Sequence, residues 1–214
     1  MKEILIFSAG PAGREIFQLI NEINKKKKEW KVAGYVDDEI EKKLRYLDEV
    51  KVFSNNNKPS GNRLYAITGI MDPKIRSKIF KNEIKKNNYK IPNLIHPKIE
   101  LPECFKLGKG NIIFNNVHIS FEVSLGDFSV VSNFSDLGHN LNAKDFLTIM
   151  PSVTVGGNCT IGKSVLIGSG VKILQNLNIG DNCKIGIGST VISSLKKNSS
   201  LIDFQRKVIK KSDH

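Results

Sequence analysis

The sequence predicts two different folds in one chain: an α/β domain over residues 1–92 and an all-β parallel β-helix over residues 93–214. Every sixth residue from Ile95 to Val191 is aliphatic, and the register never breaks. A glycine follows many of these residues, whereas the first domain lacks the period altogether. A sustained period of six matches neither a helix nor simple strand alternation. It is typical of hexapeptide repeats, in which each hexad forms one short strand and one turn.

The repeat also predicts the geometry of the second domain. The repeat positions are Ile95, Leu101, Leu107, Ile113, Ile119, Leu125, Val131, Leu137, Ala143, Ile149, Val155, Ile161, Ile167, Ile173, Ile179, Ile185 and Val191. Three hexads, about 18 residues, close one triangular coil, so we expect about five to six stacked coils. We expect the glycine after a repeat position to form a corner with positive φ. An ordinary β-sandwich rich in Ile and Gly is the alternative, which the unbroken register disfavours.

Residues 1–92 follow a strand, loop and helix order instead. The expected strands are residues 4–7, 32–36 and 64–68, and the expected helices are residues 14–27 and 74–87. A glycine-containing loop joins the first strand to the first helix. This order predicts a small parallel α/β domain. The polar segment 38–63 shows no defined pattern.

The first loop and the ends of the next strands provide candidate substrate-binding residues. These candidates are Gly10, Pro11, Ala12, Asp37, Asp38 and Gly69. A glycine-rich turn before a helix can hold a phosphate at the helix N-terminus. An acidic pair after the second strand can accept hydrogen bonds from a ribose or a base, although a turn-forming Asp pair explains it equally well. The domain is too short for a complete two-half dinucleotide fold, which disfavours hydride transfer.

Composition excludes several classes of protein. The 214 residues carry a formal net charge of +12, but the basic residues are scattered and no nucleic-acid recognition motif accompanies them. We therefore expect no nucleic-acid partner and interpret the charge as a solvated surface that attracts anionic small molecules. The N-terminus predicts a short strand rather than a signal peptide. No apolar run approaches the roughly 18 residues that span a bilayer, so we expect a cytoplasmic protein.

The three cysteines predict neither a disulfide framework nor a metal site. Cys159 and Cys183 occupy inward repeat positions, where they are expected to be small core residues, and Cys104 lies where the repeat begins. No CxxC pair is present, and the odd count argues against a disulfide scaffold. A zinc site would need three converging histidines, but only His118 and His139 lie within the repeat. We therefore expect no bound metal.

Four stretches together resemble a known enzyme family. They are residues 4–15 (ILIFSAGPAGRE), 34–38 (GYVDD) and 93–97 (NLIHP), followed by the hexad array. In order and spacing they resemble the hexapeptide-repeat sugar acetyltransferases, which include the sialic-acid O-acetyltransferases and the UDP-4-amino-sugar N-acetyltransferases of the bacillosamine pathway. The resemblance implies a Rossmann-like nucleotide-sugar-binding domain and a left-handed β-helix. It also implies acetyl-CoA as donor and a homotrimer with active sites between subunits.

The resemblance makes His139 and Asn140 the candidate catalytic residues. A histidine at this place in similar enzymes removes a proton from the acceptor amine or hydroxyl, because a protonated amine cannot attack the thioester. The residue after this histidine is commonly acidic in the family, but here it is the uncharged Asn140. A second family histidine, nine residues further on, is replaced by Thr148, which could still donate a hydrogen bond to the donor.

The resemblance also implies where acetyl-CoA binds. The candidate cofactor-binding residues are Thr148, Gly157, Ser169 and Ile187. We expect Gly157 to lie one coil above His139 and to leave room beside it. The family's Gly-x-Pro-Ala tail loop is replaced by residues 203–207 (DFQRK), which puts the adenine contacts in doubt.

Three functions remain open on the sequence. The first is acetyl transfer to a nucleotide-linked sugar, at an amino group, for surface glycan biosynthesis. The second is O-acetylation of sialic acid or another surface sugar. The third is a trimeric sugar-nucleotide-binding scaffold without catalysis, which Asn140 and Thr148 would support. Asp37 and Asp38 favour the nucleotide-linked acceptor, and His96 is expected to mark the domain junction.

Overall fold

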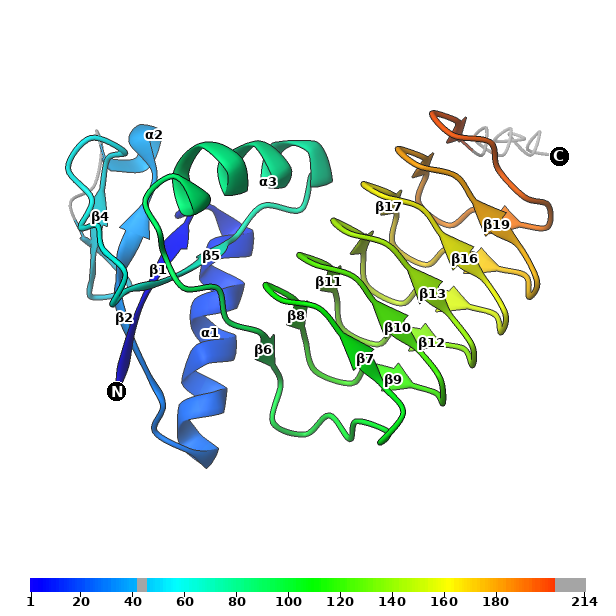
Figure 1. The fold of residues 1–214 in the computed structure, drawn as a ribbon, viewed down its shortest axis with the longest axis horizontal. Coiled ribbons are helices and arrows are strands. Elements are labelled where there is room, and N and C mark those ends of the chain that lie inside the picture. The colour runs from blue at the N-terminus through cyan, green and yellow to red at the C-terminus, as the bar shows by residue number, and fades with distance from the viewer. Residues whose placement is uncertain (42–45, 203–214) are drawn as a thin grey trace, which may run out of the picture.

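A computed structural model describes residues 1–41 and 46–202, and it shows the two predicted parts joined in one elongated molecule (Figure 1). Residues 203–207, which replace the family's tail loop, lie outside the described residues. The N-terminal part is a five-stranded sheet with helices, and the C-terminal part is a stack of short parallel strands (Figure 1).

The N-terminal sheet has the strand order β3-β4-β2-β1-β5, and only the β3–β4 pair is antiparallel. Its elements are β1 (Lys2–Phe7), α1 (Pro11–Lys26), β2 (Trp30–Val36), α2 (Asp38–Glu41), β3 (Tyr46–Leu47), β4 (Val50–Phe53), β5 (Tyr65–Thr68), α3 (Pro73–Ile79) and the π-helix η1 (Phe80–Lys85). The predicted parallel α/β arrangement is therefore present. The sequence missed α2, β3 and β4, because two- to four-residue elements leave no period to detect.

Alternation along β1 explains why this sheet is covered on both faces. Ile4 and Ile6 pack in one cluster with Ile16 and Ile20 of α1, and all four side chains are buried. The alternate residues Leu5 and Phe7 pack in a second cluster, with Ile84 of η1, on the other face. Successive strand residues point to opposite faces, so one apolar strand serves two cores.

The C-terminal part is a parallel β-solenoid with three sheets. We name them the β7 sheet, the β8 sheet and the β9 sheet after one of their strands. The β7 sheet contains β7 (Lys106–Leu107), β10 (Ser124–Leu125), β13 (Asn142–Ala143), β16 (Thr160–Ile161) and β19 (Asn178–Ile179). The β8 sheet contains β6 (Leu94–Ile95), β8 (Ile112–Ile113), β11 (Val130–Val131), β14 (Thr148–Ile149), β17 (Leu166–Ile167), β20 (Lys184–Ile185) and β22 (Ser200–Leu201). The β9 sheet contains β9 (His118–Ile119), β12 (Asp136–Leu137), β15 (Thr154–Val155), β18 (Lys172–Ile173) and β21 (Thr190–Val191).

Register within the solenoid follows the repeat. Leu125, for example, pairs with Leu107 in the coil before and with Ala143 in the coil after, at steps of three hexads. The repeat side chains from Ile113 to Val191 point inward and form one continuous core that includes Cys159 and Cys183, as predicted. Leu101 differs from the prediction, because its side chain is 43% exposed and lies outside this core. Cys104 is exposed.

The corners correct one prediction. From Leu107 to Ile185, left-handed backbone falls three residues after the repeat position, as at Asn140 with φ 56° and Asn158 with φ 58°, and not at the glycine that directly follows. The glycines are needed for a different reason, because the next coil approaches them too closely for a side chain. A Cβ on Gly138 would lie 2.6 Å from the carbonyl oxygen of Val155. Glycine is therefore required here by stacking and not by its conformational freedom.

The N-terminal part covers the β8 sheet. Leu94, Ile112 and Val130 point outward from that sheet into the N-terminal core. The buried guanidinium of Arg76 in α3 strengthens the junction by donating to the carbonyl oxygens of Phe128 (3.0 Å) and Leu147 (2.9 Å). Its Nη1 also donates to the carbonyl oxygens that precede α3. The two parts are thus held together by packing and by a hydrogen-bonded cation.

Among the described residues, no helix combines the length and the apolar character that a membrane span requires. The same part of the chain contains no group of three or more side chains placed to hold a metal ion.

Candidate active site

His139 lies at the corner between the β9 sheet and the β7 sheet, which we call the β9–β7 corner. Its ring stacks on Phe121, one coil earlier, with the ring centroids 5.2 Å apart and the planes 7° from parallel. One coil later, a Cβ on Gly157 would lie only 2.4 Å from the His139 Nε2. The predicted position of Gly157 above His139 is confirmed. The ring is therefore confined between an aromatic face and a backbone.

Asn140 and Glu122 lie on the Nδ1 side of the His139 ring and form a chain of hydrogen bonds with it. The His139 Nδ1 lies 2.8 Å from the Asn140 Oδ1. The amide nitrogen of Asn140 donates to the carboxylate of Glu122, which lies one coil earlier. Glu122 was not among the predicted residues. The sequence nevertheless contained the signal, because the coil repeat places Phe121 below His139 and Glu122 below Asn140.

This arrangement can accept a proton at one defined atom. An amide oxygen only accepts hydrogen bonds, so the His139 Nδ1 must carry the proton that is shared with Asn140. In the neutral ring, Nε2 then holds a free lone pair in the ring plane, while the Gly157 backbone lies over the ring face. A partly exposed imidazole of this kind suits general base catalysis near neutral pH.

The structure places Thr148 away from this corner, contrary to its assignment to the cofactor. Thr148 is fully buried on the outer face of the β8 sheet, and its hydroxyl donates to the Met71 carbonyl oxygen at 2.7 Å. Thr148 follows His139 by nine residues, which is not a multiple of six. His139 therefore lies at a corner, whereas Thr148 lies within a strand. The side chain therefore joins the two domains in this chain.

Ser169 and Ile187 occupy yet another edge. Both follow strands of the β8 sheet and lie at the corner that leads to the β9 sheet, here the β8–β9 corner. Ile187 is 78% exposed, so its side chain is available to a ligand or a second chain. Within one chain these two residues are not brought together with His139 and Gly157.

The loop after β1 has the geometry that the sequence suggested. Pro11 begins α1, Gly10 precedes it, and no side chain caps this helix N-terminus. A Cβ on Gly69 would lie 2.5 Å from the Gly13 Cα, so the loop packs tightly against the end of β5. Such an uncapped N-terminus is suited to an anion, and Ala12 lies in its first turn.

The acidic pair supports this loop. The Asp37 carboxylate accepts from the backbone N–H of Ala9 (3.0 Å) and from those of Glu39 and Ile40 (both 3.1 Å). Asp38 accepts from the backbone and side-chain nitrogens of Asn55, each at 2.7 Å. Asp37 thereby ties the loop after β1 to the end of β2.

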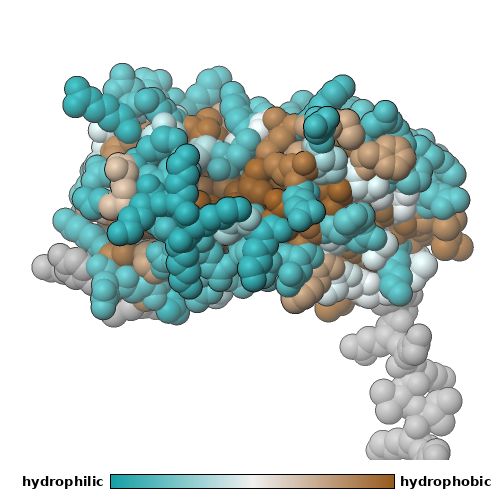
Figure 2. Space-filling view, turned by 90° about the horizontal axis from the view of Figure 1, so that it is seen from below, coloured by the Kyte–Doolittle hydropathy of each residue, from teal (hydrophilic) through white to brown (hydrophobic). Residues whose placement is uncertain are grey.

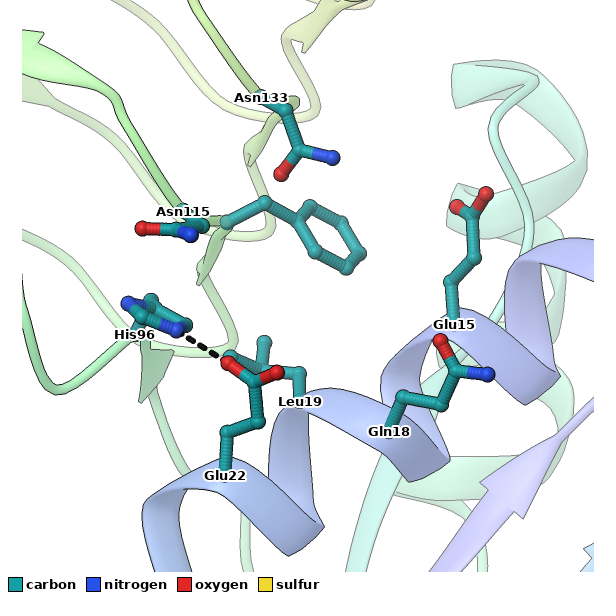
Figure 3. Close-up of a pocket in the computed structure, with 8 residues that line it drawn as sticks. Glu15, Gln18, Leu19, Glu22, His96, Asn115 and Asn133 are labelled. Carbon is teal, nitrogen blue, oxygen red and sulfur yellow. Dashed lines mark hydrogen bonds and ion pairs between the residues drawn. The ribbon is translucent and has the colours of Figure 1, made fainter. Parts of the chain in front are cut away.

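A polar cleft of about 250 Å³ lies between α1 and the β8–β9 corner (Figure 3). Glu15 and Gln18 of α1 lie across from Asn115 and Asn133 of the solenoid. His96, which is buried as expected of a junction residue, bonds through Nε2 to the Glu22 carboxylate. The sequence missed this cleft because no local pattern joins a helix to loops about a hundred residues further on.

His139 and the loop after β1 lie on opposite sides of the solenoid. The N-terminal part contacts the β8 sheet, whereas the β9–β7 corner is the edge opposite that sheet in a three-sided coil. One chain therefore does not bring its loop to its own His139.

Comparison with solved structures places this geometry among known folds. A variant of perosamine N-acetyltransferase from Caulobacter crescentus, in complex with CoA and GDP-perosamine, matches with a TM-score of 0.81 and 18% identity over 92% of each chain. The acetyltransferase domain of PglB from Neisseria gonorrhoeae gives 0.82 and 20%, covering 94% of this chain and 96% of that one. WeeI from Acinetobacter baumannii gives 0.80 and 20%, covering 92% and 94%.

The chain has the fold of these acetyltransferase structures. The matches span both domains, so the architecture of an α/β part followed by a parallel β-solenoid is confirmed. No model of a known protein family and no curated protein sequence matches the chain.

Proposed function

We propose that the protein transfers an acetyl group from acetyl-CoA to the amino group of a nucleotide-linked sugar. The observation that carries the proposal is His139, whose ring lies between Phe121 and the Gly157 backbone with Nδ1 held by Asn140, which leaves the Nε2 lone pair free. Two further findings support it. The fold matches a perosamine N-acetyltransferase bound to CoA and GDP-perosamine, and the PglB domain has been solved with acetyl coenzyme A.

In the proposed reaction, the amine nitrogen attacks the acetyl carbonyl carbon and a C–N bond forms. The tetrahedral intermediate collapses as the C–S bond breaks, and CoA leaves as a thiolate. His139 Nε2 accepts the proton that the amine loses, and this proton then neutralises the thiolate. Asn140 keeps Nδ1 protonated throughout, so that Nε2 remains the basic atom. Acetyl-CoA is an intracellular metabolite, and the proposed activity accordingly places the enzyme in the cytoplasm.

The N-terminal part is proposed to be a Rossmann-like domain that holds the nucleotide. The uncapped start of α1, with Gly10, Pro11 and Ala12, would receive the diphosphate. The end of β5 at Gly69 closes one side of this loop, and Asp37 sets its shape. The sugar would then extend along α1 toward the cleft beside Asn133.

We further propose a homotrimer of left-handed β-helices, packed through their β9 sheets. Large exposed apolar residues line both edges of that sheet: Phe121, Leu174 and Ile192 at the β9–β7 corner, and Phe134 and Ile187 at the β8–β9 corner. Figure 2 views the molecule from below and shows hydrophobic surface among polar side chains along the solenoid. Exposed apolar surface of this kind marks an interaction site.

Three-fold packing on the β9 sheet would complete the active site. It sets the β9–β7 corner of one copy against the β8–β9 corner of the next copy. His139 would then face the cleft beside α1 of the partner. Gly157 of the same copy, together with Ser169 and Ile187 of the partner subunit, would line the groove for acetyl-CoA.

A thiol-release assay with acetyl-CoA tests the activity. The purified protein would be offered UDP-, dTDP- and GDP-linked 4-amino sugars, their hydroxyl analogues and free sialic acid. We expect CoA release with an amino sugar nucleotide and loss of turnover in His139→Ala. His118→Ala is a second comparison, because the His118 Nδ1 also bonds to a side chain, Asp136, at 2.7 Å. Since His118 lies on the β9 sheet proposed to pack in the trimer, the oligomeric state of this variant is measured alongside its activity.

The outcomes separate the alternatives. Turnover confined to hydroxyl acceptors would favour the O-acetyltransferase. Binding of a sugar nucleotide without CoA release on any acceptor would favour the scaffold. Full activity of His139→Ala would remove the proposed base.

Mixed oligomers test the shared site. Asp37→Ala is expected to raise the acceptor KM far more than the acetyl-CoA KM, because it loosens the loop after β1. Co-expressed His139→Ala and Asp37→Ala chains should form hybrid trimers in which some sites combine an intact His139 with an intact loop. Activity above that of either parent supports a site between subunits, whereas purely additive activity contradicts it.

A further inference from the structure

We propose that Glu122 is a positioning residue that orients and polarises His139 through Asn140. The contacts form one line from the carboxylate to the ring. Glu122 accepts from the Asn140 amide nitrogen, and the Asn140 Oδ1 lies 2.8 Å from the His139 Nδ1. This inference rests on the proposed function, in which His139 is the base.

The backbone holds both partners in place. Glu122 and Asn140 are equivalent corner residues of successive coils, with the same left-handed φ of 56°. The Asn140 N–H donates to the Phe121 carbonyl oxygen at 3.0 Å, and the Glu122 N–H donates to the Cys104 Sγ at 3.1 Å. The two side chains therefore start from fixed points one coil apart.

Glu122 decides which way the Asn140 amide faces. A carboxylate accepts hydrogen bonds and cannot donate, so it selects the NH2 end of the amide. The oxygen of Asn140 must then face His139, which requires a proton on Nδ1 and leaves Nε2 as the base. Without the carboxylate, the amide could turn its NH2 toward Nδ1 and favour the opposite tautomer, in which Nε2 is protonated and inactive.

Glu122 also supplies the negative charge that residue 140 lacks. This charge polarises the Asn140 amide and so strengthens its hydrogen bond with the His139 Nδ1, without direct contact between Glu122 and the ring. The titratable side chains that share the adjoining groove with Glu122 are Cys104 and Lys106.

The test compares Glu122→Gln, Asn140→Asp and the double variant, with Glu103→Gln as a control for loss of an exposed carboxylate nearby. In Glu122→Gln we expect about a tenfold loss of kcat, since general base catalysis contributes about a hundredfold or more. Both KM values should change less than twofold.

The double variant carries the decisive comparison. The aspartate introduced at position 140 would place a carboxylate directly on the His139 Nδ1, without help from position 122. In the double variant, log kcat should therefore regain at least half of the decrease that Glu122→Gln causes. A Glu122→Gln variant that matches Glu103→Gln in kcat overturns the proposal. So does a double variant that is no better than Glu122→Gln.

A readout without substrate separates this inference from the proposed function. Nitrogen-15 NMR of the histidine rings reports which nitrogen carries the proton. We expect the Nδ1–H tautomer for His139 in the unmodified protein and a mixture in Glu122→Gln. If the tautomer shifts but no acceptor is acetylated, the positioning role stands and the proposed function fails. If acetylation occurs but the tautomer is unchanged by Glu122→Gln, the positioning role fails alone.

Discussion

Gly157→Ala should displace the His139 ring without disturbing the solenoid. The new Cβ would lie 2.4 Å from Nε2 and 2.5 Å from Cε1, where ordinary contact begins near 3.4 Å. The ring must therefore shift by about 1 Å. It cannot do so freely, because Phe121 stacks on it with centroids 5.2 Å apart and Asn140 holds Nδ1 at 2.8 Å. A displacement of about 1 Å at a reacting group costs up to about a hundredfold in rate.

The assay is steady-state CoA release, with both substrates varied. We expect kcat to fall by about 30- to 100-fold with smaller changes in KM. Thermal unfolding should change little, since the methyl group meets the end of a side chain and residue 157 has no left-handed φ that would strain alanine.

Gly186→Ala is the matched control. It is also a corner glycine, but its Cβ would meet nothing closer than the Leu201 carbonyl oxygen at 3.3 Å. We expect it to retain kcat within about twofold, because it moves no group near His139. A Gly157→Ala enzyme that is folded and retains full kcat would refute the claim that the ring position matters.

Three other predictions follow from packing and charge. Arg76→Met should lower the free energy of unfolding by about 3 kcal/mol or more in urea titrations, because it strips buried carbonyl oxygens of a charged donor; an unchanged midpoint would contradict this. The side-chain hydrogen bond from Arg14 lowers the pKa of the Asp48 carboxyl. The ion pair between Arg14 and Asp48 therefore stabilises the protein above the ordinary carboxyl pKa of about 4, and this stabilisation is lost as the pH falls through the lowered pKa of Asp48 in the folded protein. The difference in free energy of unfolding between the unmodified protein and Asp48→Asn should accordingly disappear in acid. Leu174→Glu should convert trimers to monomers by light scattering, whereas Ile75→Glu, at an equally exposed apolar position on α3, should not.

Much of the solenoid could be predicted because its order is local. Each hexad sets its own strand and turn, and stacking merely repeats the pattern, so inward residues such as Cys159 and the Gly157–His139 pair followed from counting alone. The corners were predicted less well. Residues such as Asn140 adopt the positive φ, whereas the glycines are required by contacts with the next coil.

The repeat could not predict which solenoid residues are buried by the N-terminal part. Thr148 was assigned to the cofactor but is covered by the segment around Met71, because docking of the N-terminal part buries the β8 sheet. The apolar outward residues Leu94, Ile112 and Val130 recur with the coil and could have indicated which face is covered.

The sequence by itself determined the two-part architecture, the coil register and the corner position of His139, since each of these depends on residues close in the chain or on a fixed period. Only the tertiary structure decided that Glu122 reaches His139 through Asn140, that Thr148 is buried, and that the loop after β1 lies across the solenoid from the base. The first depends on side-chain rotamers, which a repeat position does not set, and the other two depend on the docking of two domains that no repeat relates.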